Sequence, residues 1–254
     1  MKQYKIAVVG ATGMVGRMFL RVLEERKLPV SEYFLFASER SAGTEITFMG
    51  KKHTVRELTP DAFKGLGVDI ALFSAGAGTS KTFAPIVAES GAVVIDNSSC
   101  WRMDPEIPLV VPEVNPHAIP MYKKHGIIAN PNCSTIQAMV ALKPLAVKYG
   151  LKRVIYSTYQ AVSGAGMKGY SDLENGLKGI APQKFPHPIA GNCLPHIDVF
   201  LENGYTKEEQ KMVEESRKIL DLPNLRVTAT TVRVPVFHGH SESINVGSEK
   251  PFEV

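Results

Sequence analysis

The stretch around Cys133 carries the residue types of a reactive thiol. It reads NPNCSTI (130–136) and lies between a short apolar run, 126–129, and a longer apolar stretch of helical composition. We therefore expect Cys133 in the first turn of a helix, where the helix dipole and the backbone N–H groups favour the thiolate. The same N–H groups could hold the oxyanion of a tetrahedral intermediate. Covalent catalysis through a cysteine is the chemistry that this pattern predicts.

The alternative is that Cys133 is a small buried apolar residue, as most free cysteines are. Its polar neighbours favour the reactive thiol: Asn130, Asn132, Ser134 and Thr135. The other two cysteines, Cys100 and Cys193, lie in weaker settings and are expected to have no catalytic role. Three cysteines in 254 residues form no disulfide framework, so we expect a reducing, cytoplasmic compartment.

A thiolate that acts on an aldehyde needs a base to move protons. The best candidate is a histidine beside Gly239, either His238 or His240, in the segment RVPVFHGHSES (233–243). This segment also supplies Arg233. The two histidines could instead bind a metal ion, but no third ligand with a suitable spacing accompanies them, so we expect no metal. The remaining histidines are expected in solvated or structural positions: His53, His117, His125, His187 and His196.

A glycine-rich loop, GATGMVG (10–16), follows a short apolar run and precedes a helical stretch. In that context the first glycine allows a tight turn, the second lets the backbone approach a pyrophosphate, and the third lets helix and strand pack closely. The helix N-terminus then offers N–H groups to the phosphates. The alternative is a structural turn with incidental glycines, which the strand–turn–helix context makes less plausible. The loop predicts dinucleotide binding.

The end of the second expected strand bears on the choice between NAD and NADP. It reads ASERS (37–41), in which Arg40 and the serines at 38 and 41 suit a ribose 2′-phosphate. Glu39 could hold a 2′-hydroxyl instead, which leaves NAD open, but we expect NADP. A second glycine-rich turn, QAVSGAG (160–166), could equally be a plain tight turn.

Charge and hydropathy limit the classes of partner. The net charge of +4 is mild and Lys and Arg are scattered, so we expect no nucleic acid partner. No apolar stretch reaches membrane-spanning length, and the N-terminal apolar run is too short for a signal peptide. We therefore expect a small-molecule substrate and no membrane.

Strand-like and helix-like segments alternate in the first half of the chain, which predicts a parallel sheet covered on both faces. The second half ends in a long alternating run that suits an antiparallel strand. We place a domain boundary near residue 130. The expected strands are 4–9, 33–37, 69–73, 92–95, 126–129, 153–159 and 225–236. The expected helices are 81–90, 134–149, a charged and exposed one at 207–220, and an amphipathic one whose apolar face is formed by Met14, Val15, Met18, Phe19, Val22 and Leu23.

Eight stretches, in order along the chain, give it a resemblance to the aspartate-semialdehyde dehydrogenases. They are GATGMVG (10–16), ASERSAG (37–43), LFSAG (72–76), DNSSCWRMD (96–104), VVPEVNP (110–116), NPNCSTIQ (130–137), STYQAVSGAG (157–166) and RVPVFHGHSES (233–243). The resemblance implies reversible, NADPH-dependent reductive dephosphorylation of L-aspartyl-4-phosphate to L-aspartate-4-semialdehyde through a cysteine thioester. This is a step toward lysine, threonine and methionine.

The fold that the resemblance implies has two parts. Residues 1–129 form a Rossmann-type, doubly wound NADP-binding domain. Residues 130–254 form an α+β catalytic and dimerisation domain with a largely antiparallel sheet, which here is C-terminally incomplete. A homodimer is expected on the same ground.

The resemblance also implies roles for individual residues. Cys133 matches the nucleophile, His240 the acid/base residue and Gln160 the glutamine that positions the substrate and intermediate. Arg233 matches the arginine that grips the substrate carboxylate, and Glu208 the glutamate near its amino group. These pairings suit the shapes of the groups, because a guanidinium fork fits a carboxylate.

Further matches concern the phosphate and the cofactor. Arg102 and Lys211 match the phosphate-binding pair, and Asn132 is expected among the substrate-binding residues. Without the resemblance, Glu208 and Lys211 would be taken for a surface ion pair on one helix face. The expected cofactor contacts are Gly10, Thr12, Gly13, Met14, Val15, Ser38, Arg40, Ser41, Ser74, Ala75, Gly76, Ser163 and Gly164.

Two questions stay open from the sequence. Family members continue with a segment that returns to the nucleotide domain, whereas this sequence ends at SEKPFEV (248–254), so we expect either a fragment or a truncated form. The activity could also be that of a related reductase for N-acetylglutamyl phosphate or for an acyl-CoA. The first of these usually has a glycine–cysteine–tyrosine–proline pattern at the thiol, whereas here Asn132 and Ser134 flank it, which argues against that reductase. A noncatalytic NADP-binding protein is the third possibility, and the presence of both Cys133 and His240 argues against it.

Overall fold

The computed structural model describes residues 2–251, so the last three residues of the segment SEKPFEV (248–254) lie outside the described part. The chain forms two compact units. The first contains Met1–Val110 and His117–Asn130, and the second contains Val111–Pro116 and Pro131–Val254. In the described part of the chain, no helix has the length and apolar character needed to cross a membrane.

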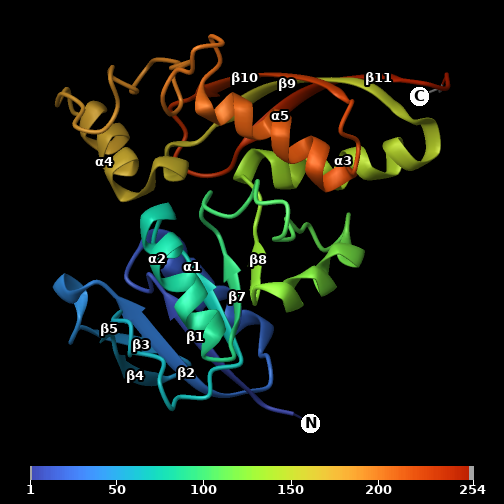
Figure 1. Cartoon of the computed structure of the whole chain (residues 1–254). Helices are drawn as coiled ribbons and strands as arrows, with labels where there is room; N and C mark the ends of the chain where they lie inside the picture. The colour runs from blue at the N-terminus through green and yellow to red at the C-terminus, as the bar shows by residue number, and fades with distance from the viewer. Residues whose placement is uncertain (1, 252–254) are drawn as a thin grey trace. The chain divides into compact units, whose positions relative to one another are not determined.

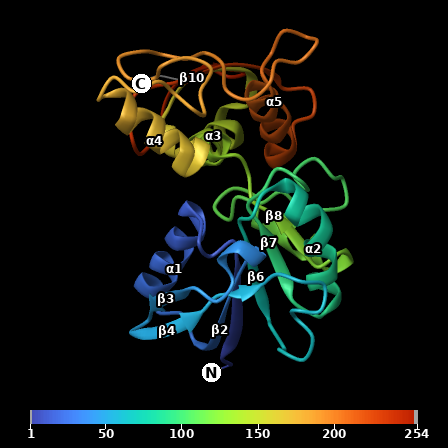
Figure 2. The ribbon, with the colours of Figure 1, turned by 90° about the vertical axis from the view of Figure 1, so that its left-hand side faces the viewer.

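The first unit is built on a six-stranded sheet in the order β5-β2-β1-β6-β7-β8, in which all pairings are parallel. The strands are β1 Tyr4–Val9, β2 Val30–Ala37, β5 Arg56–Glu57, β6 Ile70–Phe73, β7 Val93–Asp96 and β8 Ile127–Ala129. Helix α1, Met14–Arg26, covers one face, and α2, Ala77–Glu89, covers the other (Figure 2). The expected doubly wound parallel sheet is confirmed.

Strand β1 shows why the parallel arrangement follows from the sequence. Its last four residues are buried and apolar without interruption, because helices cover both faces of the sheet. Ile6 and Val8 pack into a core with Leu20, Leu23 and Leu35. An alternating strand with one solvated face would have left every second residue exposed.

Helix α1 presents a different face to the core from the one expected. Gly16, Leu20 and Leu23 are buried, whereas three of the expected core residues, Val15, Met18 and Val22, are exposed. The reason is the close approach at Gly16, where a Cβ atom would overlap the Gly10 carbonyl. The periodicity correctly predicted a helix, but the glycine decides which face packs against the strand.

A hairpin that the sequence reading missed follows β2 and the short helix η1, Glu39–Ser41. It consists of β3 Glu45–Phe48 and β4 Lys51–Thr54, which pair in antiparallel register. Met49 and Gly50 connect the strands with φ of 52° and 69°, the left-handed pair that suits a two-residue hairpin turn.

The second unit contains a three-stranded sheet in the order β10-β9-β11 (Figure 1). Its elements are α3 Cys133–Tyr149, β9 Leu151–Gln160, η3 Val162–Ala165, α4 Gly166–Gly176, α5 Lys207–Leu220, β10 Arg226–Arg233 and β11 Ser241–Ser248. Helices α3 and α5 lie side by side on one face of the sheet.

The direction of β10 corrects the expectation for 225–236. β10 pairs with β9 in parallel, and only β11 is antiparallel to β9, so the sheet is mixed. The connection from β9 to β10 runs through α4 and α5, which is a crossover of the kind that parallel neighbours need. Residue alternation correctly indicated one covered face, but it carries no information about strand direction.

Helix α5 begins and ends where expected, yet it is not the exposed helix that its charges suggested. Glu208, Glu209 and Glu215 are buried. Glu209 and Thr206 form a capping box, and the second Glu209 oxygen accepts the Thr231 N–H at 3.1 Å. The buried Glu209 carboxylate is tolerated because backbone donors satisfy both of its oxygens.

Candidate active site

Cys133 is the first residue of α3, as expected, and it is exposed. Asn132 is the N-cap, and its Oδ1 accepts the N–H groups of Ser134 at 2.9 Å and Thr135 at 3.2 Å. The helix start thus presents the sulfur to solvent in a setting that favours a thiolate. These two N–H groups are already bonded, so they are not the oxyanion donors that the sequence suggested.

His240 lies against this thiol. Its Nε2 is 3.3 Å from Cys133 Sγ, although 107 positions separate the two residues. Its Nδ1 accepts the backbone N–H of Ala161 at 2.9 Å. His238 lies elsewhere, with its ring centroid 5.6 Å from that of Tyr170. Of the two candidate histidines, the structure therefore brings only His240 to the thiol.

The surroundings of His240 oppose a positive charge. Burial and the Arg233 guanidinium lower the pKa of His240, and they outweigh the opposing effects of Glu208 and the Gly239 carbonyl. The imidazole is therefore neutral near pH 7.

Gln160 and Asn132 meet at one carboxylate. Glu208 Oε1 accepts Asn132 Nδ2 at 2.8 Å and Gln160 Nε2 at 3.1 Å, and all three residues are buried. Thr158 donates its hydroxyl to Gln160 Oε1 at 3.0 Å, which fixes the orientation of that amide. Residues from β9, α5 and the start of α3 are thereby locked together.

Glu208 is buried and Lys211 is half-buried, so the two do not form the surface ion pair that their spacing alone suggested. Lys211 Nζ is 3.1 Å from Glu208 Oε2 and 2.9 Å from Asp198 Oδ2. Burial alone would raise the pKa of Glu208, but Lys211 and the two amides outweigh it and hold the pKa below its usual value. Burial alone would lower the pKa of Lys211, and the two carboxylates reverse this. Both groups are charged.

Arg233, at the end of β10, is 5% exposed. Its Nη1 donates to the Ala161 carbonyl at 2.7 Å, while its buried Nε has no hydrogen-bond partner among the described residues. Burial lowers the pKa of Arg233, opposed by Glu208 and Cys133. A guanidinium with a spare buried donor suits an anionic group of a ligand.

The second glycine-rich turn lies next to these side chains. Ser163 and Gly164 belong to η3, and a Cβ atom on Gly164 would lie 2.9 Å from Arg233 Nη1 and 3.4 Å from His240 Nε2. This glycine keeps space open beside the thiol and histidine, so the turn is more than a plain connection. We call Cys133, Gln160, Glu208, Arg233 and His240 the thiol site.

One residue that supports this site was not predicted from the sequence. Glu215 Oε2 accepts the backbone N–H of Asn132 at 2.6 Å. Glu208 and Glu215 are seven residues apart, two turns of α5, and so project from the same side of the helix. That spacing was the available signal, and the assumption of an exposed helix hid it.

The first unit holds a pocket of about 470 Å³, which we call the glycine-loop pocket. Six expected cofactor contacts line it: Gly10, Thr12, Gly13, Ser38, Ser74 and Ala75. Val9, Ala37, Glu39, Leu58, Thr79 and Phe83 complete its lining. The pocket lies at the carboxyl ends of β1, β2 and β6, the edge at which open parallel sheets bind ligands.

The loop geometry fits a dinucleotide. Gly10 has a φ of 87°, and a Cβ atom there would overlap the Ser74 carbonyl. Gly13 and Gly76 are the N-caps of α1 and α2, and neither provides a side-chain cap to its helix. Backbone N–H groups at such helix starts suit phosphate oxygens.

The remaining expected contacts of this unit lie beside the pocket and do not line it. Met14 and Val15 begin α1, Arg40 and Ser41 belong to η1, and Gly76 precedes α2. The lining residues Thr79 and Phe83 were missed, although their position after LFSAG (72–76), four residues apart on a helix, was a usable signal.

Arg102 also lies in the first unit, whereas its expected partner Lys211 lies in the second. It is largely buried, and it donates from Nε to the Asn130 carbonyl at 2.9 Å and from Nη2 to the Asn97 carbonyl at 3.1 Å. Backbone oxygens thus hold its guanidinium in place.

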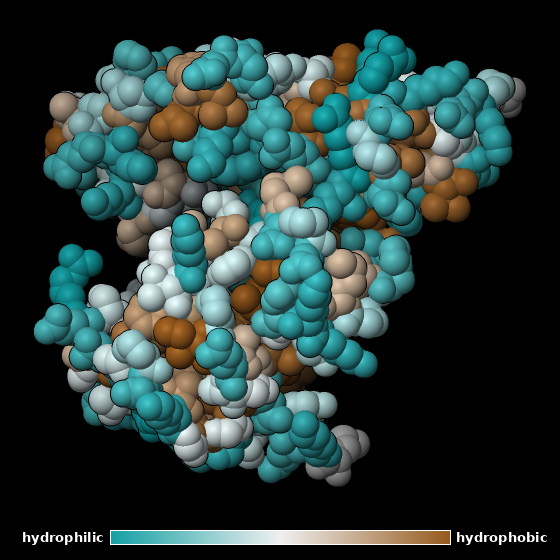
Figure 3. Space-filling view, viewed as in Figure 1, coloured by the Kyte–Doolittle hydropathy of each residue, from teal (hydrophilic) through white to brown (hydrophobic). Residues whose placement is uncertain are grey.

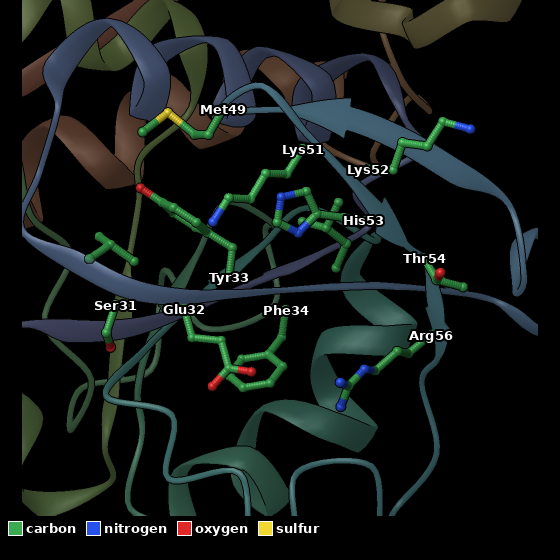
Figure 4. Close-up of a pocket in the computed structure, with 12 residues that line it drawn as sticks. Ser31, Glu32, Tyr33, Phe34, Met49, Lys51, Lys52, His53, Thr54 and Arg56 are labelled. Atoms are coloured by element: carbon green, nitrogen blue, oxygen red, sulfur yellow. The ribbon is translucent and has the colours of Figure 1, made fainter.

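A larger cavity of about 550 Å³ lies at the free edge of β2, next to β4 (Figure 4). Lys51, Lys52, His53 and Arg56 line it, together with residues 30–35. None of the expected site residues lines this edge cavity, and we assign no chemistry to it. Among residues 2–251, no group of three or more His, Cys, Asp or Glu side chains is placed to hold a metal ion.

Comparison with known proteins gives matches to both units. Residues 5–122 match the family model for the NAD binding domain of semialdehyde dehydrogenases, and residues 142–254 match the model for their dimerisation domain. The chain is 62% identical to the aspartate-semialdehyde dehydrogenase of Aquifex aeolicus, over 97% of this chain and 74% of that protein.

Solved structures agree with these matches. The crystal structure of aspartate semialdehyde dehydrogenase II from Vibrio cholerae, complexed with ASA, superposes with a TM-score of 0.94 at 50% identity, covering 99% of this chain and 76% of that one. The Candida albicans aspartate semialdehyde dehydrogenase, solved with NADP, gives a TM-score of 0.73 at 28% identity over 96% of this chain and 71% of that one. The chain therefore spans about three quarters of the length of these relatives.

Proposed function

The chain belongs to the aspartate-semialdehyde dehydrogenase family, and we propose that it carries out the family's reaction through Cys133 and with NADP as its cofactor. The reaction is the reversible reductive dephosphorylation of L-aspartyl-4-phosphate to L-aspartate-4-semialdehyde, a step toward lysine, threonine and methionine. The observation that carries the proposal is the 3.3 Å distance between Cys133 Sγ and His240 Nε2 at the exposed start of α3.

In this mechanism the thiolate of Cys133 attacks the acyl phosphate carbon, phosphate leaves, and a thioester remains on the sulfur. NADPH supplies the hydride that reduces the thioester. His240 is the acid/base partner at the reacting oxygen, and Gln160 orients the intermediate because Glu208 and Thr158 hold its amide. In the reverse direction the thiolate adds to the aldehyde, and phosphate cleaves the resulting thioester.

The charges of the thiol site suit an amino acid substrate. Arg233 is assigned to the α-carboxylate, since its buried Nε is a spare donor. Glu208 is assigned to the ammonium group, because its lowered pKa keeps it ionised. Asn132 lies next to both the thiol and this carboxylate. Arg102 and Lys211 are assigned to phosphate, where Lys211 must exchange part of its pairing with Asp198 and Glu208.

NADP is assigned to the glycine-loop pocket, with Ser163 and Gly164 as further contacts from η3. Arg40 and Ser41 follow Ser38 at the end of β2 and offer a guanidinium and a hydroxyl to a 2′-phosphate. Glu39 lines the pocket and would favour a 2′-hydroxyl, so the preference for NADP depends on Arg40. The NADP bound in the Candida albicans relative supports this choice.

We further propose that 1–129 is the NADP-binding domain and that 130–254 is the catalytic and dimerisation domain of a homodimer. The match of 142–254 to the dimerisation-domain model supports this assignment. The sheet face opposite α3 and α5 carries the exposed Tyr159, between the buried residues Thr158 and Gln160, and is the candidate contact surface. Apolar residues lie in scattered groups among polar ones on the molecular face in Figure 3.

Reduction of NADP⁺ in the presence of aspartate semialdehyde and phosphate tests the proposal. We expect a rate that requires both compounds and that is lost in Cys133→Ala. A preference for N-acetylglutamate semialdehyde would point to the related reductase. Binding of NADPH without turnover of any semialdehyde would point to a noncatalytic protein.

A further inference from the structure

Two carboxylates share the ammonium group of Lys211. Its Nζ lies 3.1 Å from Glu208 Oε2 and 2.9 Å from Asp198 Oδ2. Burial alone would raise the pKa of both carboxyls, but Lys211 and their hydrogen bonds outweigh it and hold each pKa below its usual value. Lys207 attracts Asp198 and Arg233 attracts Glu208, both from beyond hydrogen-bond distance. The three groups joined by hydrogen bonds therefore carry one excess negative charge.

The two oxygens of Glu208 have different partners. Oε1 accepts Asn132 Nδ2 at 2.8 Å and Gln160 Nε2 at 3.1 Å, whereas Oε2 is bonded to Lys211. Oε2 is thus the oxygen to which the ammonium group of an amino acid substrate can bind. Two ammonium groups at one oxygen repel each other strongly where little water screens them. The substrate must therefore displace Lys211 from Oε2.

Asp198 is held in place independently of Lys211. Its φ of 69° lies in the left-handed region, which Asp tolerates better than most side chains, and its Oδ1 accepts the N–H of Val199 at 2.9 Å. Leu194 and Arg233 exchange two backbone hydrogen bonds, at 2.9 and 2.8 Å, and Lys207 N donates to Val199 O at 2.8 Å. The segment that carries Asp198 is therefore fixed at both ends, so its carboxylate stays where it is when Lys211 moves.

The exposure of the two carboxylates bears on which one Lys211 releases. The Asp198 side chain is 34% exposed and that of Glu208 is 8% exposed. Release from Asp198 would be compensated by water, but it would leave Lys211 on Oε2, where the substrate ammonium has to bind. Release from Glu208 exchanges one ammonium for another, so that no buried charge is left unpaired.

We propose, as a refinement that rests on the function proposed above, that Asp198 is a positioning residue for recognition of the substrate ammonium group: it retains Lys211 when that ammonium takes the place of Lys211 at Glu208 Oε2. In the free protein Lys211 neutralises Glu208. In the complex the substrate ammonium cancels the excess negative charge, and the other N–H groups of Lys211 are available to phosphate. Asp198 thereby favours amino acids over simple carboxylic acids without touching the substrate.

A pair of unreactive ligands tests this in the resting protein. L-2-aminobutyrate has a methyl group in place of the aldehyde of the semialdehyde, and butyrate also lacks the ammonium group. Their dissociation constants are measured by ligand-observed NMR titration of the wild type and of Asp198→Asn. Asn tolerates the same backbone conformation and can still accept the Val199 N–H, but it carries no charge.

We expect Asp198→Asn to weaken L-2-aminobutyrate about tenfold, the loss that follows from removal of one charged hydrogen bond. Butyrate should change by less than about twofold, because it leaves Lys211 at Glu208. Unchanged affinity for L-2-aminobutyrate, or an equal loss for the two ligands, would overturn the proposal.

Asp221→Asn is the matched control. Asp221 is also an exposed aspartate with a positive φ, 57°, but it lies at the opposite end of α5. Its substitution should alter the affinity of neither ligand, and a loss equal to that of Asp198→Asn would count against a specific role of Asp198. Glu208→Gln, which changes the direct contact, should weaken L-2-aminobutyrate at least as much as Asp198→Asn does.

A crystal structure of the wild type with L-2-aminobutyrate shows the exchange itself. We expect the ligand nitrogen at Glu208 Oε2, and Lys211 Nζ still bonded to Asp198 Oδ2. A Lys211 Nζ that remains on Glu208 Oε2 beside the bound ligand would overturn the proposal.

Failure of this refinement and failure of the proposed function give different results, because both ligands bind without turnover. Turnover of aspartate semialdehyde, together with unchanged binding of L-2-aminobutyrate in Asp198→Asn, would leave the function standing and remove the refinement. A selective loss of L-2-aminobutyrate binding in a protein that turns over no semialdehyde would do the reverse.

Discussion

The glycine-loop pocket and the thiol site are formed by different kinds of chemical group. Glu39 is the only charged residue among those that line the glycine-loop pocket, and the chain there is shaped by glycines at the ends of β1 and β6. The thiol site, in contrast, consists of polar and charged side chains from α3, β9, α5, β10 and the turn before β11. The glycine loop at 10–16 is one contiguous stretch of sequence, whereas the thiol site forms only when five elements of the second unit are folded together.

The glycine-loop pocket and the thiol site also differ in the kind of substitution that damages them. A glycine is needed for space, so any added atom is harmful and chemical type matters little. In the thiol site the buried Glu208 carboxylate accepts hydrogen bonds from the Asn132 and Gln160 amides, so its removal leaves both amides without that partner. The predictions below test this difference, from the largest expected effect to the smallest.

Cys133→Ala should separate catalysis from cofactor binding. We expect kcat to fall on the order of 10⁴-fold or more, as for removal of other catalytic nucleophiles. NADPH affinity should change by less than about twofold if the two sites act independently. Steady-state rates and fluorescence titration measure the two quantities. Cys193→Ala, which changes another exposed cysteine of the same unit, is the control and should keep full activity. A parallel loss of NADPH binding would show that the glycine-loop pocket and the thiol site do not act independently.

Gly16→Ala should damage the first unit selectively. The added methyl overlaps the Gly10 carbonyl, so we expect a loss of about 1–3 kcal/mol in the free energy of unfolding and weaker NADPH binding. Gly78→Ala is the matched control, because a Cβ there meets nothing within 4 Å. The reactivity of Cys133 toward iodoacetamide should be the same in both variants. If Gly16→Ala also lowers the reactivity of Cys133 toward iodoacetamide, the two units are not independent.

Glu208→Gln should disturb the thiol site and its response to pH. The new amide faces the donors of Asn132 and Gln160, so we expect a cost of about 1–3 kcal/mol in unfolding free energy. The lowered pKa of Glu208 means that its stabilisation is complete above the ordinary value of 4.5 and is lost as the pH falls through the lower folded value. The stability difference between wild type and variant should therefore shrink below pH 4.5. Denaturant titrations at several pH values measure it, and a constant difference would contradict the assignment.

Arg40→Ala tests whether Arg40 binds the 2′-phosphate of NADPH. Loss of one hydrogen bond to a charged phosphate, about 1.5 kcal/mol, corresponds to roughly tenfold weaker NADPH binding. NADH affinity should not change. Lys51→Ala removes another exposed cation of the same unit, at the edge cavity, and should have no effect on either cofactor. Equal weakening of NADPH and NADH would show that Arg40 does not read the 2′-phosphate.

The same difference explains which features of the fold and the site could be predicted from the sequence. The glycine loop, the parallel sheet and the position of Cys133 at a helix start follow from contiguous patterns, and the structure confirms them. The face of α1 was wrong because Gly16, and not hydropathy, sets its packing. The choice between His238 and His240 could not be made from local sequence, since it depends on a contact between residues that are 107 positions apart.

Other errors have the same origin. The burial of α5 depends on hydrogen bonds that its carboxylates accept from Asn132, Gln160 and Thr231, which no local pattern encodes. For that reason Glu215 was missed and α5 was expected to be exposed. The parallel direction of β10 depends on the route of the connection through α4 and α5, which residue alternation does not report.

The most direct test is to look for the covalent intermediate on Cys133. The protein is incubated with aspartate semialdehyde and NADP⁺ in the absence of phosphate, and the peptide that contains Cys133 is examined by mass spectrometry. The account predicts an aspartyl thioester on this residue, formed together with NADPH and removed when phosphate is added. Formation of NADPH with an unmodified Cys133, or with the adduct on Cys100 or Cys193, would contradict it.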